Sequence, residues 1–131
     1  MRKEVLEEFN PWWFTGKVPE DILEEYRREQ FGEVIKRLTR RQIIAVTGLR
    51  RVGKTTLLYQ TVQYLLNKNI EPTNILYFSF DETVKGLDDL MNTYRENQRK
   101  DFRKNKVYIF LDEIQKLENW QNQLKKYHDL Y

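Results

Sequence analysis

Three short apolar runs, separated by more polar segments, dominate the chain after residue 40. Residues 42–47, 75–80 and 107–111 are rich in β-branched and aromatic side chains, which is typical of strands buried in a parallel sheet. Between and after them, apolar residues recur at helical spacing and predict helices over residues 54–67, about 87–98, and from about 119 to the chain end. Alternating strands and helices imply right-handed crossovers, so we expect an α/β sandwich with a parallel sheet.

The first 40 residues follow a different pattern. Residues 10–16 are aromatic and turn-rich, so we expect an irregular strap there. Residues 22–38 carry apolar positions at roughly helical spacing, after a proline at a position that a first helical turn tolerates. Two interpretations stay open for Trp12, Trp13 and Phe14: they stack on an adenine ring, or they form a hydrophobic strap over the core.

Residues 48–55 match G-x-x-x-x-G-K-[ST], the P-loop motif, between a predicted strand and a predicted helix. Glycines let such a loop curl so that its backbone N–H groups enclose a phosphate, and the helix N-terminus adds positive potential. We expect Lys54 to reach the β- and γ-phosphates and the Thr55 hydroxyl to ligate Mg²⁺. The predicted nucleotide-binding residues are Gly48, Arg50, Arg51, Val52, Gly53, Lys54, Thr55 and Thr56.

The apolar run 107–111 ends in two acidic residues, which is a Walker B pattern. Asp112 should reach the carboxyl edge of the sheet, where open α/β folds bind ligands, and hold Mg²⁺ through its water shell. Glu113 should polarise the attacking water, with Lys54 as the second predicted catalytic residue. Ser79 either holds Glu113 away from water by a hydrogen bond or is an ordinary serine at a strand end.

Composition narrows the setting of this site. The chain has no cysteine, which excludes disulfides and thiolate metal sites and fits a reducing cytoplasm. Its apolar runs are too short to cross a bilayer, so we expect no membrane insertion. Because 23 basic residues nearly balance 20 acidic ones, the net charge permits contact with nucleic acid without requiring it.

From residue 41 to residue 115 the chain resembles the archaeal and bacterial ATPases of the AAA+ superfamily that a DNA-binding-like or nuclease-like C-terminal region usually follows. Residues 42–56, 77–82 and 109–116 carry the resemblance, and Asn10-Pro11-Trp12-Trp13 and the Trp120 region are also similar. The resemblance implies a three-layer P-loop fold in which an additional strand lies between the Walker A and Walker B strands.

In such ATPases that strand follows Walker B in sequence and carries a polar sensor residue, with an arginine finger and a C-terminal domain further on. We therefore expect residues 41–131 to be the N-terminal part of a P-loop ATPase domain, preceded by a strap and helix in residues 1–40. Later strands, sensor and finger would be missing. Strands 1 and 3 would then have unpaired edges that invite self-association or a protein partner.

The sequence favours a Mg-ATP-binding module whose hydrolysis drives a conformational switch in an attached or partner domain. A carboxylate beside the metal residue suits activation of water, whereas a phosphotransferase must position an acceptor and exclude water. Two alternatives stay open. One is a P-loop phosphotransferase, and the other is a non-catalytic ATP-binding fragment that acts through a partner.

Overall fold

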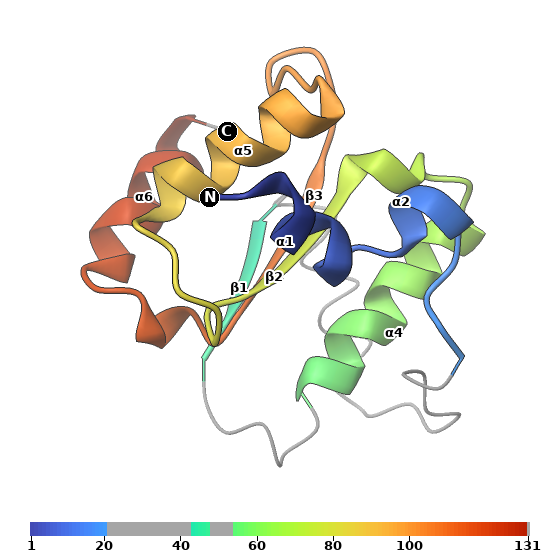
Figure 1. Cartoon of the computed structure of the whole chain (residues 1–131), viewed down its shortest axis with the longest axis horizontal. Helices are drawn as coiled ribbons and strands as arrows, with labels where there is room; N and C mark the ends of the chain where they lie inside the picture. The colour runs from blue at the N-terminus through green and yellow to red at the C-terminus, as the bar shows by residue number, and fades with distance from the viewer. Residues whose placement is uncertain (21–42, 48–53, 131) are drawn as a thin grey trace.

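The computed structural model describes residues 1–20, 43–47 and 54–130 (Figure 1). The predicted helix over residues 22–38 and residues 48–53 of the P-loop motif lie outside the described residues. The elements, in chain order, are α1 (Lys3–Phe9), α2 (Trp12–Thr15), β1 (Ile43–Val46), α4 (Lys54–Asn67), η2 (Pro72–Asn74), β2 (Ile75–Ser79), α5 (Leu87–Gln98), β3 (Tyr108–Asp112), η3 (Ile114–Lys116) and α6 (Trp120–Leu130).

The three predicted strands and the three later helices are all present, which confirms the α/β class. Two of the helices, α4 and α5, have the predicted bounds. β3 is one residue further along than predicted, so Asp112 is its last residue rather than the residue after it. The apolar pattern sets these elements because each buries a continuous stripe or run against its neighbours.

The three strands form one parallel sheet in the order β1-β3-β2. Val46 and Ser79 both pair with Asp112, so all three strands end at one edge of the sheet. The expectation that strands 1 and 3 have unpaired facing edges is wrong, because β1 pairs with β3 from Ile43↔Ile109 to Val46↔Asp112. Direct pairing satisfies backbone N–H and C=O groups that would otherwise be buried without partners.

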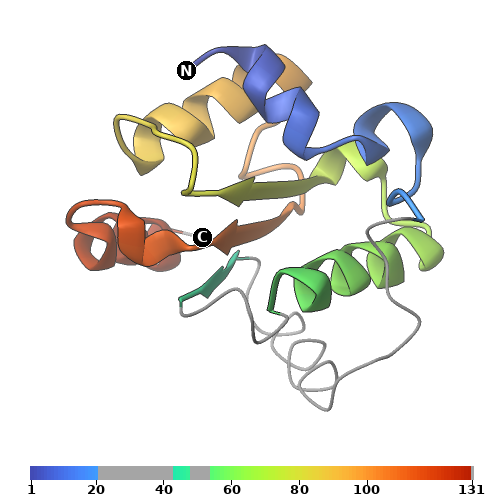
Figure 2. The same cartoon turned by 60° about the horizontal axis from the view of Figure 1, so that its bottom comes forward.

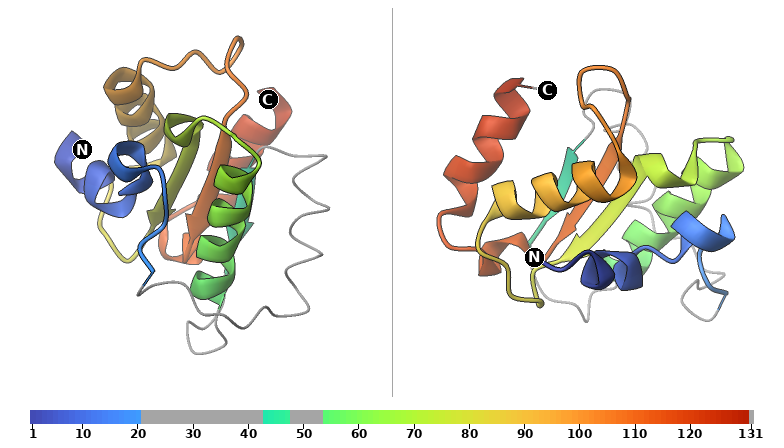
Figure 3. Two further views of the ribbon diagram at one scale, coloured as in Figure 1. Left: turned by 90° about the vertical axis from the view of Figure 1, so that its right-hand side faces the viewer. Right: turned by 45° about the horizontal axis from the view of Figure 1, so that its top comes forward.

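The helices form layers on the two faces of this sheet. The β1–α4–β2 connection passes β3 to reach the far edge, whereas β2–α5–β3 returns by one position. Right-handed crossovers in opposite directions put their helices on opposite faces, and Figure 3 shows α4 on one face and α5 with α6 on the other. The expected layered sandwich is therefore present around a three-stranded sheet.

The N-terminal segment covers the outer edge of β2 (Figure 2). The Asn10 side-chain amide accepts the Tyr77 backbone N–H at 2.6 Å and donates to the Tyr77 carbonyl at 2.9 Å, as a neighbouring strand would. The indole N–H groups of Trp12 and Trp13 both donate to the Ile75 carbonyl, at 3.1 and 2.7 Å. These side chains therefore occupy hydrogen-bonding positions of an edge strand that would otherwise be open to another chain.

This segment is more regular than the predicted irregular strap. It contains α1, which the sequence analysis did not predict, and one helical turn, α2, closed by Gly16 at φ 76°. A helix of seven residues is not stable alone; Leu6, which is fully buried, anchors α1 against the core. Trp12 and Trp13 are buried at the start of β2, which favours the strap interpretation for these two residues, whereas Phe14 is 69% exposed.

One hydrophobic core joins the N-terminal segment to the sheet. Leu6, Trp12 and Val18 pack in the same cluster as the strands and helices after residue 43. The proposed division at residue 40 stays a prediction. Within the ranges that the structure describes, no helix has both the length and the apolar character needed to cross a membrane.

Candidate functional site

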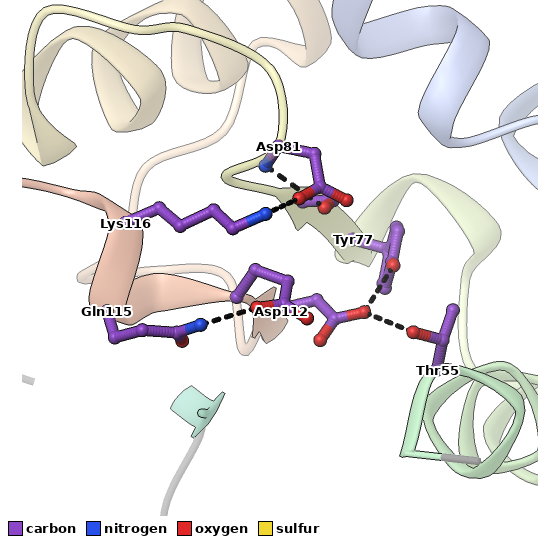
Figure 4. A network of polar contacts seen from close by, with 8 residues as sticks. Thr55, Tyr77, Asp81, Asp112, Gln115 and Lys116 are labelled. Carbon is purple, nitrogen blue, oxygen red and sulfur yellow. Dashed lines mark hydrogen bonds and ion pairs between the residues drawn. The ribbon is translucent and has the colours of Figure 1, made fainter. Parts of the chain in front are cut away.

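The candidate site lies where β3 ends and α4 begins. The Thr55 hydroxyl, in the first turn of α4, donates a hydrogen bond of 2.7 Å to Asp112 Oδ2 (Figure 4). Asp112 is the last residue of β3 and only 1% exposed. A buried carboxylate is costly unless it is paired or hydrogen-bonded, so this contact both stabilises Asp112 and brings together a hydroxyl and a carboxylate 57 residues apart in sequence.

A second hydroxyl reaches the same carboxylate oxygen from β2. Tyr77 donates to Asp112 Oδ2 at 2.8 Å, the same oxygen that Thr55 contacts (Figure 4). Burial raises the pKa of the Tyr77 phenol well above its ordinary value, and the negative charge of Asp112 raises that pKa further. The phenol therefore stays protonated and remains a hydrogen-bond donor.

Glu113 follows in an unusual backbone conformation. Its φ of 57° and ψ of 37° lie in the left-handed region, which costs a non-glycine residue of order 1 kcal/mol or more. The carboxylate is buried, and Gln115 Nε2 donates a hydrogen bond to its Oε2. Ser79 Oγ, which is also buried, accepts the Asp81 N–H at 3.3 Å. Gln115 is thus one donor to the Glu113 carboxylate, and the expected role of Ser79 stays a prediction.

A pocket of about 390 Å³ opens onto this cluster. Its walls come from α1, the start of α4, β2 with the turn after it, and β3. The lining residues are Phe9, Thr55, Thr56, Tyr77, Ser79, Asp81 and Asp112. Beside the pocket, Lys116 of η3 forms an ion pair with Asp81, which ties the turn after β2 to the segment after β3. Hydroxyls and carboxylates dominate the lining, a donor set that suits a hydrated hard cation.

The predicted site residues divide into two groups. Thr55, Thr56 and Asp112 line one pocket, and Glu113 follows Asp112 directly. Gly48, Arg50, Arg51, Val52 and Gly53 lie outside the described residues, as does the Lys54 side chain, although α4 begins at Lys54. Their contacts with a nucleotide stay predictions.

Four residues of the site were not predicted from the sequence. Tyr77 contacts Asp112, Gln115 contacts Glu113, and Phe9 and Asp81 line the pocket. Tyr77 lies within an apolar strand run, where a tyrosine is an ordinary core residue, so no local signal separates it from its neighbours. Gln115 follows Glu113 by two residues, which is a spacing that a search around the acidic pair could have included.

The donor set fits Mg²⁺ held partly by water. Mg²⁺ prefers oxygen ligands in octahedral geometry and keeps several waters when one or two protein groups and phosphate oxygens bind it. Thr55 and Asp112 supply a hydroxyl and a carboxylate side by side. Among the described residues, no group of three or more His, Cys, Asp or Glu side chains could hold a metal ion, so a site built from carboxylates alone is not present in them.

Comparison with known proteins identifies the class. A family model described as "AAA domain" matches residues 40–131. The chain therefore belongs to the AAA domain family, whose members are P-loop nucleotide-binding modules.

Two curated relatives extend this finding without adding a function. The chain is 39% identical over 93 residues to an uncharacterized protein of Methanocaldococcus jannaschii, covering 69% of this chain and 20% of the relative. It is 36% identical over 83 residues to an uncharacterized protein of Haemophilus influenzae, covering 60% of this chain and 20% of the relative. The chain thus spans a fifth of the length of these relatives. No solved structure matches it.

Proposed function

We propose that this chain is a Mg-ATP-binding module that hydrolyses ATP and couples hydrolysis to a conformational switch in an attached or partner domain. The observation that carries the proposal is the 2.7 Å contact between Thr55 and Asp112. It brings the end of a P-loop motif and the end of a Walker B pattern to one pocket, in a chain of the AAA domain family. If the glycine-rich turn were a chance match to the motif, the contact between Thr55 and Asp112 would have no explanation.

The residues divide the binding task. The backbone N–H groups of residues 48–53 and the Lys54 ammonium would hold the phosphates, since both are donors suited to an anion. Thr55 and Asp112 would hold the Mg²⁺, with water completing its coordination. When bound, Mg²⁺ supplies positive charge that offsets the charge of the phosphate oxygens. Thr56, which lines the pocket, would contribute its hydroxyl to the nucleotide side.

Glu113 supports hydrolysis rather than phosphotransfer. A carboxylate next to the metal residue would accept a proton from a water molecule and raise its nucleophilicity. Its carboxylate accepts a hydrogen bond from Gln115, and its backbone is left-handed directly after Asp112. Strained conformations of this kind persist where the surrounding structure holds them, and they cluster at functional sites. This supports hydrolysis, since a phosphotransferase has no use for an activated water.

Titration of the chain with ATP in the presence of Mg²⁺ tests the proposal. Lys54→Ala removes one ammonium; because charge-assisted hydrogen bonds contribute about 1.5–3 kcal/mol, affinity should fall by roughly 10- to 100-fold. Lys125→Ala is the matched control, because Lys125 is an exposed lysine of α6, and it should bind like the wild type. Absence of nucleotide binding by the wild-type chain would overturn the proposal. Binding without turnover would overturn hydrolysis and leave the two alternatives, a non-catalytic fragment or a phosphotransferase that lacks its acceptor.

A further inference from the structure

We infer that Tyr77 is a positioning residue for the metal site: its hydroxyl fixes the Asp112 carboxylate, and the N-terminal segment in turn fixes Tyr77. This inference rests on the proposed function of the site, because it concerns how Asp112 would hold Mg²⁺. It assigns a role to a residue inside an apolar strand and to a contact made by Asn10, which lies 67 residues away in sequence.

Two donors from different elements contact the Asp112 carboxylate. A carboxylate at the end of a strand can rotate about its terminal bond, and two donors from different elements stop that rotation. Thr55 donates from α4 and Tyr77 from β2, both to Oδ2, at 2.7 and 2.8 Å. The Thr55 oxygen is itself a proposed metal ligand, so it would be shared with the ion. The Tyr77 hydroxyl is not a proposed metal ligand, so its bond can hold the carboxylate whether or not the metal is bound.

Residues of the N-terminal segment and α4 contact Tyr77. The Asn10 side chain is hydrogen-bonded to both the backbone N–H and the backbone carbonyl of Tyr77. Its ring packs against Tyr59 with centroids 4.7 Å apart and against Phe9 at 6.1 Å. Phe9 immediately precedes Asn10 and lines the pocket. The end of α1 therefore supports Tyr77 through both backbone and ring, and a displacement of this segment would move the phenol that holds Asp112.

If the Tyr77 hydroxyl had only a structural role, its removal would have the same effect as removal of another buried tyrosine hydroxyl, and Tyr94 allows this comparison. Tyr94 is also a fully buried tyrosine, and its hydroxyl donates to the Thr73 carbonyl at 2.7 Å. That acceptor is a backbone group just before the start of β2, whereas Asp112 lies at the end where all three strands terminate. Removing the Tyr94 hydroxyl deletes its bond to a backbone carbonyl. Removing the Tyr77 hydroxyl deletes its bond to a proposed metal ligand and its side-chain hydrogen bond with Tyr59.

The experiment compares Tyr77→Phe with Tyr94→Phe in the 131-residue chain. Affinity for a non-hydrolysable ATP analogue is measured with Mg²⁺ and again with EDTA, and the ratio of the two dissociation constants reports the metal's contribution. Loss of a partner that orients a metal ligand typically costs 10–100-fold in metal affinity. We expect Tyr77→Phe to reduce this ratio about tenfold or more while leaving the affinity in EDTA within about twofold. Tyr94→Phe should keep the wild-type ratio.

The outcomes separate the two claims. A metal-dependent wild type with an unchanged ratio in Tyr77→Phe overturns the inference and leaves the proposed function standing. A wild type that binds no nucleotide in either buffer overturns both. If Tyr77→Phe does not fold, 3-fluorotyrosine at position 77 retains the hydroxyl, and its ¹⁹F resonance should shift as Mg²⁺ is added to the nucleotide-bound chain; an unmoved resonance overturns the inference.

Discussion

Replacing Asn10 with alanine removes the amide that joins the N-terminal segment to β2. Asn10 is fully buried, and its side chain makes three hydrogen bonds: to the Tyr77 N–H, to the Tyr77 carbonyl and to the Leu6 carbonyl. Each contributes about 1 kcal/mol net, and a buried group left without a partner costs about 1–3 kcal/mol. We therefore expect Asn10→Ala to lower the free energy of unfolding by about 3 kcal/mol, from a total that is typically 5–15 kcal/mol.

Urea unfolding followed by circular dichroism measures this loss. Asn122→Ala is the matched control, since Asn122 is exposed and its amide donates to the exposed Asn119 side chain. Surface substitutions of this kind change stability by about 0.5 kcal/mol or less. If Asn10→Ala lost under about 1 kcal/mol, the amide would not act as a substitute for a neighbouring strand, and the interpretation of the covered edge would be refuted.

Two further predictions concern the acidic residues. Glu113→Gln should retain Mg-ATP affinity and lose turnover in a phosphate-release assay, because an amide cannot accept the water proton. Glu118→Gln, which changes an exposed glutamate, is the control. Unchanged turnover in Glu113→Gln would refute the assigned role. The hydrogen bond from Tyr127, followed by Lys126, holds the pKa of Asp88 below its ordinary value of 3.8, so its stabilisation is present above about pH 4 and is lost as pH falls through the folded pKa. Tyr127→Phe should therefore lower Tm more at pH 7 than at pH 2, and an equal decrease at both values would contradict this.

Much of the fold was predictable because it depends on local periodicity. The runs around β1, β2 and β3 are apolar on both faces, and the stripes of α4 and α5 repeat at helical spacing. Such patterns fix which residues are buried, and alternation of strands and helices then fixes a parallel sheet. The Walker B pattern also fixed the place of Asp112, because the end of a parallel strand always lies at the carboxyl edge.

What the sequence did not predict depends on contacts between distant residues. Strand order is one case, because the apolar runs do not indicate that β1 and β3 are neighbours, whereas the structure shows them paired. Helix α1 is another, because seven residues form a helix only when Leu6 is buried by the rest of the fold. The Tyr77 contact with Asp112 joins residues 35 positions apart, and an apolar strand run gives no sign of it.

The covered edge of β2 also has a consequence for the order of folding. Asn10, Trp12 and Trp13 bond to residues 62–67 positions later in the chain. At a synthesis rate of about 5–20 residues per second, the ribosome adds the last of those partners roughly 3 to 13 s after the segment that binds them. Two indole N–H groups and one side-chain amide therefore lack these partners until β2 has been synthesised. Docking of this segment against the sheet consequently follows the synthesis of β2.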